Sequence, residues 1–161
     1  MRRLVLVSVL CLAVGPAASA QEAGCSLIKT GAFHEDLYLA GDHVDLRGEA
    51  RGDAFIAGRT VAVDGLVQGD LAVGSGTILL RGVMGDDVRV AGQIVTVDAV
   101  IHDMLIVAGE AVRVSAGAQV GGRAWIAGRR VDIAGQVGGE LRAAGARIRI
   151  SGVIQGDVVL A

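Results

Sequence analysis

Acidic residues that recur at a fixed interval are the first candidates for chemistry in this sequence. Successive members are 17 residues apart: Asp36, Asp53, Asp70 and Asp87. If the chain returned to the same place once per interval, the carboxylates would form a column of oxygen ligands, which calcium prefers. The alternative is structural, because Asp favours corners, where its carboxylate accepts hydrogen bonds from N–H groups. Met104 and Arg123 interrupt the column, and we favour the structural interpretation.

Other patterns that could support catalysis or metal binding are weak. The three histidines, His34, His43 and His102, share no spacing that would gather them around a metal ion. No serine stands in a pattern with a histidine and an acid that would predict a triad. The segments between apolar runs are short and leave little loop from which to build a cleft. We therefore predict that the protein is not an enzyme and that it uses no cofactor.

Basic residues gather near the C-terminus, at Arg129, Arg130, Arg147 and Arg149. They could meet anionic polymers or lipid headgroups, although a solvated face is the interpretation we favour. Residues 21–103 hold 6 basic and 13 acidic residues (net −7), whereas residues 104–161 hold 7 and 4 (net +3). This asymmetry would favour head-to-tail contacts at low salt, and chance variation of surface residues is the alternative. We expect no nucleic acid partner, because the whole chain is acidic.

A repeat of 17 residues must position these side chains. Apolar residues recur at positions 2, 4, 9, 11 and 15 of the unit, and glycine or other small residues recur at positions 5, 6 and 13. One unit is 19 residues long, with the extra residues within 115–119. The units, which we call coils, begin at Asp36, Asp53, Asp70, Asp87, Met104, Arg123, Glu140 and Asp157.

The spacing of the apolar positions predicts strands, because side chains two residues apart lie on the same face of a strand. Each coil would contain three short strands with apolar side chains on one side, separated by corners that glycine favours. One coil cannot bury its apolar edge alone, but a stack of coils can. We predict an all-β protein, a right-handed three-sided parallel β-helix of about seven coils of 17 residues over residues 27–161.

Three segments show the repeat most clearly: Val61-Ala62-Val63-Asp64-Gly65, Val67-Gln68-Gly69-Asp70-Leu71 and Ile154-Gln155-Gly156-Asp157-Val158. In these units the sequence resembles the bactofilin family of bacterial polymer-forming cytoskeletal proteins. The resemblance implies a right-handed β-helix that assembles end to end into filaments without nucleotide, often near a membrane. Typical members are cytoplasmic and have disordered tails around the core, and an export signal would be a departure from them.

The N-terminus has the organisation of a secretory signal peptide. Arg2 and Arg3 precede an apolar run over residues 4–14, and Ala18-Ser19-Ala20 forms a small-residue cleavage site. We predict a signal peptide over residues 1–20, a flexible lead-in over 21–26, and a periplasmic or cell-envelope location. Membrane anchoring is less favoured, because the run is shorter than the ~20 residues that span a bilayer. Cys25 would remain as an unpaired thiol or form an intermolecular bridge.

The two ends of the predicted β-helix are candidates for self-association. The last coil stops after its first strand, which would leave an uncovered apolar layer where solenoids normally carry a cap. The predicted polymer interface comprises Leu27, Phe33, Val158 and Leu160. We therefore predict a structural protein that binds itself and forms filaments or scaffolds in the bacterial cell envelope, with the cell wall or a membrane surface as further candidate partners.

The outward third position of the coil carries large apolar residues in several coils. Tyr38 and Phe55 would be neighbours on one outer face, as would Ile106 and Trp125. Exposed apolar groups can mark a contact surface, and stacking that stabilises the strand ladder is the alternative. The contact interpretation favours a second function, an exported β-helical module that binds cell-wall or surface carbohydrate.

Overall fold

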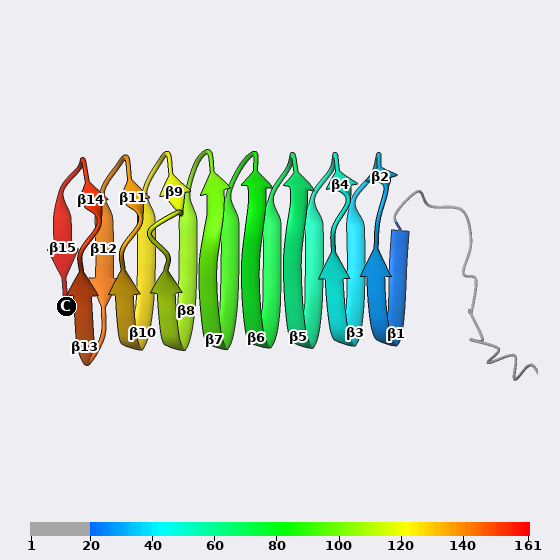
Figure 1. Cartoon of the computed structure of the whole chain (residues 1–161), viewed down its shortest axis with the longest axis horizontal. Coiled ribbons are helices and arrows are strands. Elements are labelled where there is room, and N and C mark those ends of the chain that lie inside the picture. Colours follow the sequence, from blue (N-terminus) through cyan, green and yellow to red (C-terminus); the bar gives the residue numbers. More distant parts are fainter. Residues whose placement is uncertain (1–19) are drawn as a thin grey trace, which may run out of the picture.

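The computed structural model describes the backbone of residues 20–161 and the side chains from Cys25 onward, and this part is a parallel β-helix (Figure 1). All the strand pairs in it are parallel, and it contains no helix. Its strands are β1 (Ala20–Lys29), β2 (Ala32–Phe33), β3 (Leu37–Leu46), β4 (Glu49–Ala50), β5 (Ala54–Val67), β6 (Leu71–Met84), β7 (Val88–Ile101), β8 (Leu105–Val114), β9 (Gln119–Val120), β10 (Ala124–Ile133), β11 (Gln136–Val137), β12 (Leu141–Ala144), β13 (Arg147–Ile150), β14 (Val153–Ile154) and β15 (Val158–Leu160).

The register of the ladder confirms the repeat. Leu37 pairs with Ala54, and the step of 17 residues is kept from β1 to β8. Between β7 and its neighbours the step grows from 17 at Val97–Val114 to 19 at Val100–Gln119. The two extra residues therefore lie in the turn after β8, where Ala118 donates a hydrogen bond to the carbonyl of Ser115 at 3.0 Å. Since this turn is a corner, the insertion leaves the strands on both sides in register.

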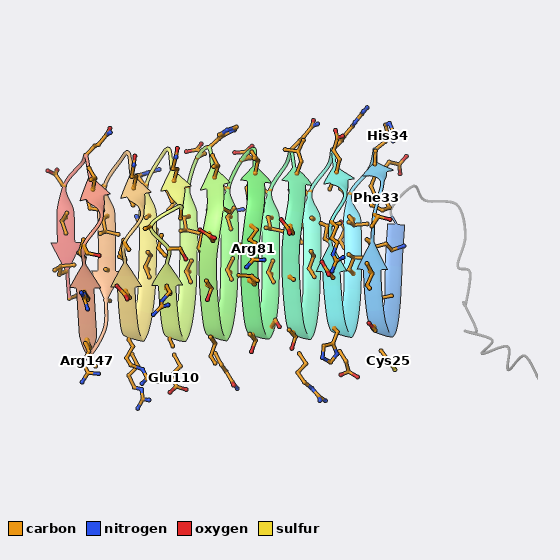
Figure 2. The ribbon with its side chains drawn as sticks, in the orientation of Figure 1. Cys25, Phe33, His34, Arg81, Glu110 and Arg147 are labelled. Carbon is orange, nitrogen blue, oxygen red and sulfur yellow. The ribbon has the colours of Figure 1, made fainter. Side chains whose placement is uncertain are left out.

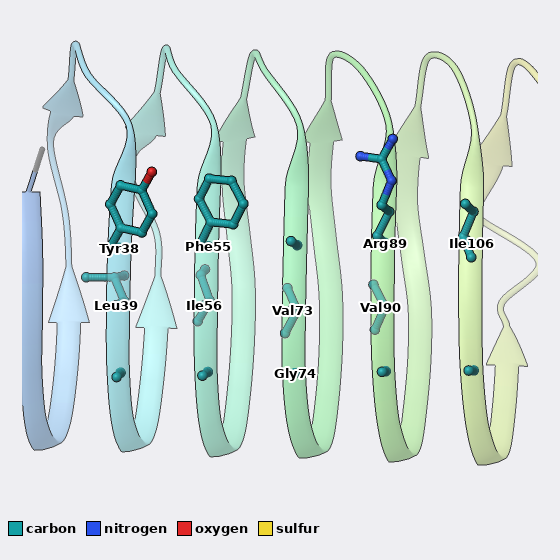
Figure 3. Close-up of a pocket in the computed structure, with 14 residues that line it drawn as sticks. Tyr38, Leu39, Phe55, Ile56, Val73, Gly74, Arg89, Val90 and Ile106 are labelled. Carbon is teal, nitrogen blue, oxygen red and sulfur yellow. The ribbon is translucent and has the colours of Figure 1, made fainter.

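Each coil has three faces. We call positions 2–5 face A, positions 8–12 face B and positions 13–16 face C. The pairing passes from Gly41–Gly58 directly to His43–Thr60, so position 7 is a corner outside the ladder. In Figure 3 the chain runs down face A, turns, and rises on face B behind while it advances from Tyr38 toward Ile106. This path is right-handed, as predicted.

The core consists of aliphatic side chains that repeat from coil to coil. On faces A and C, the residues at positions 2, 4 and 15 are buried from β3 to β12. On face B, the residues at positions 9 and 11 are buried from β3 to β10. Within the part of the chain described by side chain, no polar or charged residue is buried. Each layer is thus covered by an equivalent layer above and below it, which is the arrangement that the repeat predicts.

The N-terminal boundary differs from the prediction. Strand β1 begins at Ala20 and pairs with β3 from Ala20–Leu37 to Lys29–Leu46. The expected flexible lead-in over 21–26 is wrong in this respect, because its backbone belongs to the ladder, and it adds a coil to the seven predicted. Nine strands follow one another along the main path of the sheet, which gives eight turns. Residues 1–19, which hold nearly all of the predicted signal peptide, lie outside the described residues.

Lys29 occupies a core position in this first coil. It is half-buried, and its Nζ lies 5.8 Å from the centroid of the Phe33 ring, a distance that allows a cation–π contact. Leu27 is also half-buried and packs against the core cluster. The β1 end of the described rod therefore carries a cation at a position that is apolar in the later coils.

Glycine is required at one corner for two separate reasons. Gly82 has a φ of +85°, a conformation that side-chain-bearing residues rarely adopt, and a Cβ there would collide with the carbonyl oxygen of Gly65 in the preceding coil. Gly74 differs, since a Cβ at that position would meet nothing within 4 Å. The register of the coils therefore depends on Gly82 but not on Gly74.

We predict that Gly82→Ala lowers the free energy of unfolding by about 1–3 kcal/mol, because strain and a backbone collision add together. The matched control, Gly74→Ala, should leave it unchanged or raise it by up to about 1 kcal/mol, by restricting the unfolded chain. Urea unfolding followed by circular dichroism measures both. Equal effects of the two substitutions would contradict this account of the corner.

Candidate functional site

The last coil exposes its core positions. Ile148, Ile150 and Ile154 are only half-buried, although the equivalent residues of earlier coils are buried. Val158 is 47% exposed and Leu160 is 54% exposed in strand β15. These five side chains form an aliphatic layer at the β15 end of the rod, and we call it the terminal layer.

The backbone of the last coil also faces outward along the rod axis. In seven successive coils the N–H at position 2 donates to the position 1 carbonyl of the following coil, from Leu37 to Asp53 through to Leu141 to Asp157, at 2.8–2.9 Å. By the same geometry the N–H of Val158 points away from β12, the one strand with which β15 pairs among the described residues. The terminal layer is therefore rimmed by main-chain groups able to pair with another strand.

The predicted interface residues lie at opposite ends of the rod. Leu27 and Phe33 belong to the coil of β1 and β2, whereas Val158 and Leu160 belong to β15 (Figure 1). No contact within one molecule joins the two pairs, so they could meet only between copies of the chain.

The outward residues of face A form two separate groups. The rings of Tyr38 and Phe55 are stacked, with centroids 4.9 Å apart and an interplanar angle of 6°. Ile106 and Trp125 pair in register, and the guanidinium of Arg142 lies 5.4 Å from the Trp125 ring centroid. Figure 3 shows Arg89 between the two groups, on the strand before Ile106. The four predicted face A residues are thus two pairs rather than one continuous surface.

A shallow apolar hollow of about 630 Å³ lies on face A beside the first pair. Its walls include Tyr38 and Phe55, and its floor is a row of small residues at position 5: Ala40, Ala57, Gly74, Ala91 and Ala108. The sequence does show the small residues at this position. The sequence does not show directly that these residues face outward, where their small size leaves a hollow in the surface.

Arg89 lies at the boundary of this hollow, and two carboxylates bind its guanidinium. Its guanidinium donates to Asp70 and to Asp87, each at 2.8 Å. The hydrogen bond with Asp70 is the main cause that raises the pKa of Arg89 above its ordinary value. Arg89 is therefore a wall of the hollow whose guanidinium already has two carboxylate partners.

The acidic column bonds to the backbone of the following coil. The Oδ1 atoms of Asp36 and Asp53 accept the N–H groups of Asp53 and Asp70 at 3.0 and 2.9 Å. Asp70 and Asp87 continue the series at 3.3 and 3.2 Å. The carboxylates thus tie each coil to the next, where the sequence predicted bonds within one corner. This geometry favours the structural interpretation over calcium binding.

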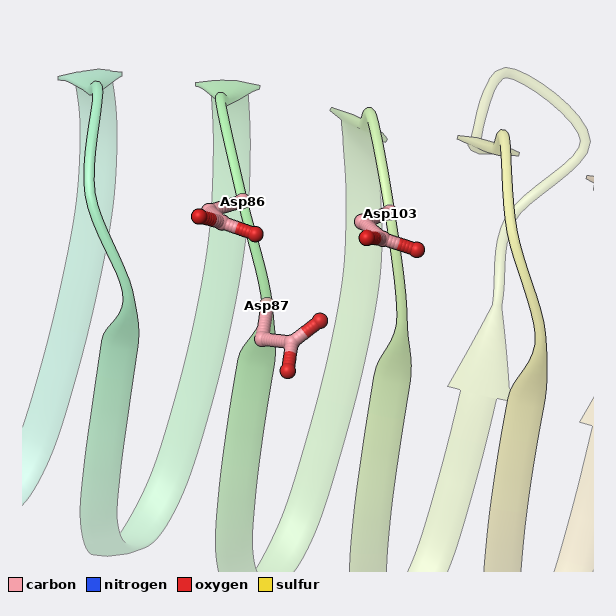
Figure 4. A group of neighbouring side chains, drawn as sticks. All are labelled: Asp86, Asp87 and Asp103. Carbon is pink, nitrogen blue, oxygen red and sulfur yellow. The ribbon is translucent and has the colours of Figure 1, made fainter.

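Three carboxylates approach one another within 4.8 Å: Asp87 of the column, and Asp86 and Asp103, which stand at position 17 of their coils (Figure 4). Both oxygens of Asp87 are engaged, since Oδ1 accepts the N–H of Met104 and Oδ2 contacts Arg89. The remaining two carboxylates are exposed. The group is therefore a surface cluster around one member of the column, whose carboxylate is already occupied by its own partners.

The basic residues lie on face B and at the corner beside it. Arg130, Arg147 and Arg149 line a groove of about 480 Å³ together with Arg113, which the sequence analysis did not include. Arg129 stands outside the groove and donates to Glu110 at 2.7 Å. Figure 2 shows Glu110 and Arg147 along the same edge of the rod as Cys25, which is exposed and forms no disulfide within the described part.

The three histidines are not brought together. His34 lies on face C, His43 lies on face B, and His102 lies on face C four coils after His34. Among the residues that the structure describes, no helix is long and apolar enough to cross a membrane.

No family model matches the chain, and comparison with curated proteins and with solved structures finds no significant match.

We predict that Asp53→Ala lowers the free energy of unfolding by about 1–2 kcal/mol, because the half-buried N–H of Asp70 loses its acceptor. Asp64→Ala is the matched control, since Asp64 is exposed and accepts no hydrogen bond from the residues that the structure describes, and it should change the value by less than about 0.5 kcal/mol. Denaturant unfolding measures both variants. An equal loss in the control would mean that net charge, rather than the coil-to-coil hydrogen bond, is responsible.

Proposed function

We propose that this protein is a non-enzymatic structural protein that assembles end to end through its terminal layer into filaments, in the manner implied by its resemblance to the bactofilin family. The observation that carries the proposal is the exposure of core positions in the last coil. Val158 and Leu160 are about half exposed, whereas their equivalents Leu141 and Ala143 in the preceding coil are buried.

The energetics of stacking support this proposal. Full burial of a Val, Leu or Ile side chain contributes about 1.5–3 kcal/mol, and the terminal layer holds five such side chains that are partly or largely accessible. Pairing of the strand edges adds main-chain hydrogen bonds to this apolar contact. Association opposes it by about 4–15 kcal/mol of lost freedom. The two contributions are of similar size, so we expect assembly to be reversible and to depend on protein concentration.

The distribution of charge favours one arrangement of the copies. The half of the chain that contains β1 is acidic (net −7 over residues 21–103), and the half that contains β15 is basic (net +3 over residues 104–161). Contact of the β15 end with the β1 end of the next copy therefore brings opposite charges together. A head-to-tail contact of this kind does not close on itself and gives an open filament. We further propose, from the N-terminal sequence, that the filaments form in the cell envelope.

The test is electron microscopy and sedimentation of the chain and two variants. We predict filaments for the unchanged protein and none for Leu160→Lys, because a charge in the terminal layer would lose its hydration when a second copy covers that layer. Val159→Lys is the matched control, since Val159 lies on the same strand, is 49% exposed, and occupies the outward third position. The control should still form filaments. Monodisperse rods of the unchanged protein at high concentration would contradict the proposal.

A second function, binding of surface carbohydrate, is favoured by one observation on face A. The Tyr38 and Phe55 rings stack on each other next to a hollow floored by small residues. Flat aromatic surfaces suit the apolar faces of sugar rings, because both partners bury apolar area.

If the protein has this second function, we predict that Phe55→Ala abolishes co-sedimentation of the protein with purified cell-wall polysaccharide. Ile94→Ala, which removes an exposed apolar side chain from face B, should leave co-sedimentation unchanged. If Phe55→Ala sediments with the polysaccharide as the unchanged protein does, the carbohydrate function is wrong.

A further inference from the structure

The groove on face B gathers positive charge that the molecule itself does not neutralise. It is lined by four arginines and one acidic residue, Asp132, so its net charge is +3. Five arginines in the described part have no ion-pair partner, and three of them, Arg113, Arg147 and Arg149, lie in this groove. Elsewhere in the described part most arginines are paired, as Arg47 is with Asp45 and Arg142 with Glu140, and the exceptions are Arg81 and Arg123.

The register places two of these cations side by side. Arg130 pairs with Arg147 in the strand ladder, so their Cα atoms are about one strand spacing, ~4.8 Å, apart. Like charges that are directly opposite in a ladder destabilise it. Arg130 is 3.9 Å from Glu110, but that carboxylate oxygen already accepts a hydrogen bond from Arg129 at 2.7 Å. The Arg130–Arg147 pair therefore lacks an anion of its own.

The second row of the groove, at position 10 of the coil, contains two arginines and a single carboxylate, that of Asp132. Asp132 pairs in register with Arg113 on one side and with Arg149 on the other, and neither guanidinium lies within ion-pair distance of it. The two arginines stand two coils apart, or about 9.6 Å, with Arg130 and Arg147 in the adjacent row. Four cations thus line a groove that runs along the rod axis.

We propose that this groove binds a linear polymer that carries phosphate groups. A monoester or terminal phosphate has three acceptor oxygens, enough to receive a guanidinium fork from Arg130 and another from Arg147, whereas one fork occupies both oxygens of a carboxylate. A chain of such groups laid along the axis reaches Arg113 and Arg149 in turn.

The walls of the groove argue against nucleic acid as the polymer. Single strands are held by basic grooves in combination with aromatic side chains on which bases stack. The residues that line this groove include Ile94, Thr96 and Ala111 and no aromatic ring. The groove therefore recognises the phosphates of the ligand rather than bases.

The test uses the full chain, with sodium tripolyphosphate as the probe in isothermal titration calorimetry at low salt. Saturable binding is expected, with an affinity that falls as salt is added. Arg147→Gln should weaken binding at least tenfold, because it removes one of two adjacent cations. Arg81→Gln is the matched control, since Arg81 is exposed on face B, has no ion-pair partner within the described part, and lies outside the groove (Figure 2).

The control variant should bind tripolyphosphate as the unchanged protein does. An equal loss in both variants would overturn the proposal, because general charge attraction would then explain the binding. Citrate and polyglutamate bound as tightly as tripolyphosphate would overturn the choice of phosphate. Binding to anionic lipid vesicles or to single-stranded DNA, without binding to tripolyphosphate, would overturn the proposed polymer in favour of those ligands. Circular dichroism of Arg147→Gln confirms that the variant is folded.

Discussion

The rest of the structure depends on one constraint: a coil buries its aliphatic side chains only when another coil covers them. Within the rod this condition is met on both sides, and residues such as Leu71, Leu80 and Met84 are fully buried without any aromatic partner. The backbone follows the same rule, because the N–H at position 2 of each coil is received by the next coil. The acidic column adds a side-chain bond in the same direction. Cohesion in this molecule therefore runs along the axis, from layer to layer.

The same constraint makes the ends and the faces chemically different. The faces present outward side chains whose identities are free to vary, and they carry aromatic rings on face A and arginines on face B. The terminal layer is not free in this way, because its side chains occupy positions that are buried in the coils between β3 and β11. The proposed assembly uses the end, while the proposed phosphate ligand uses a face. The two functions therefore do not compete for the same surface.

Much of the fold could be predicted because the repeat is regular. The apolar positions located the strands, and the 19-residue unit located the insertion between Val114 and Gln119. The start of the rod could not be predicted in this way, since Glu22 stands where Leu39 stands in the following coil and hides the register of β1. The candidate sites were harder to predict from the sequence than the fold. Which arginines lack a partner depends on side-chain conformation, and the coil-to-coil bonds of the acidic column depend on the exact height of each corner, neither of which a sequence pattern encodes.

The central claim is that the last coil is completed by another copy of the chain. The most direct measurement is hydrogen–deuterium exchange of the Val158 amide as a function of protein concentration. The account predicts that this amide exchanges rapidly in dilute solution and becomes protected as concentration rises, because it then donates to a strand of a second copy. Exchange of the Val158 amide that is independent of concentration, while assembly is seen by other means, would contradict the account.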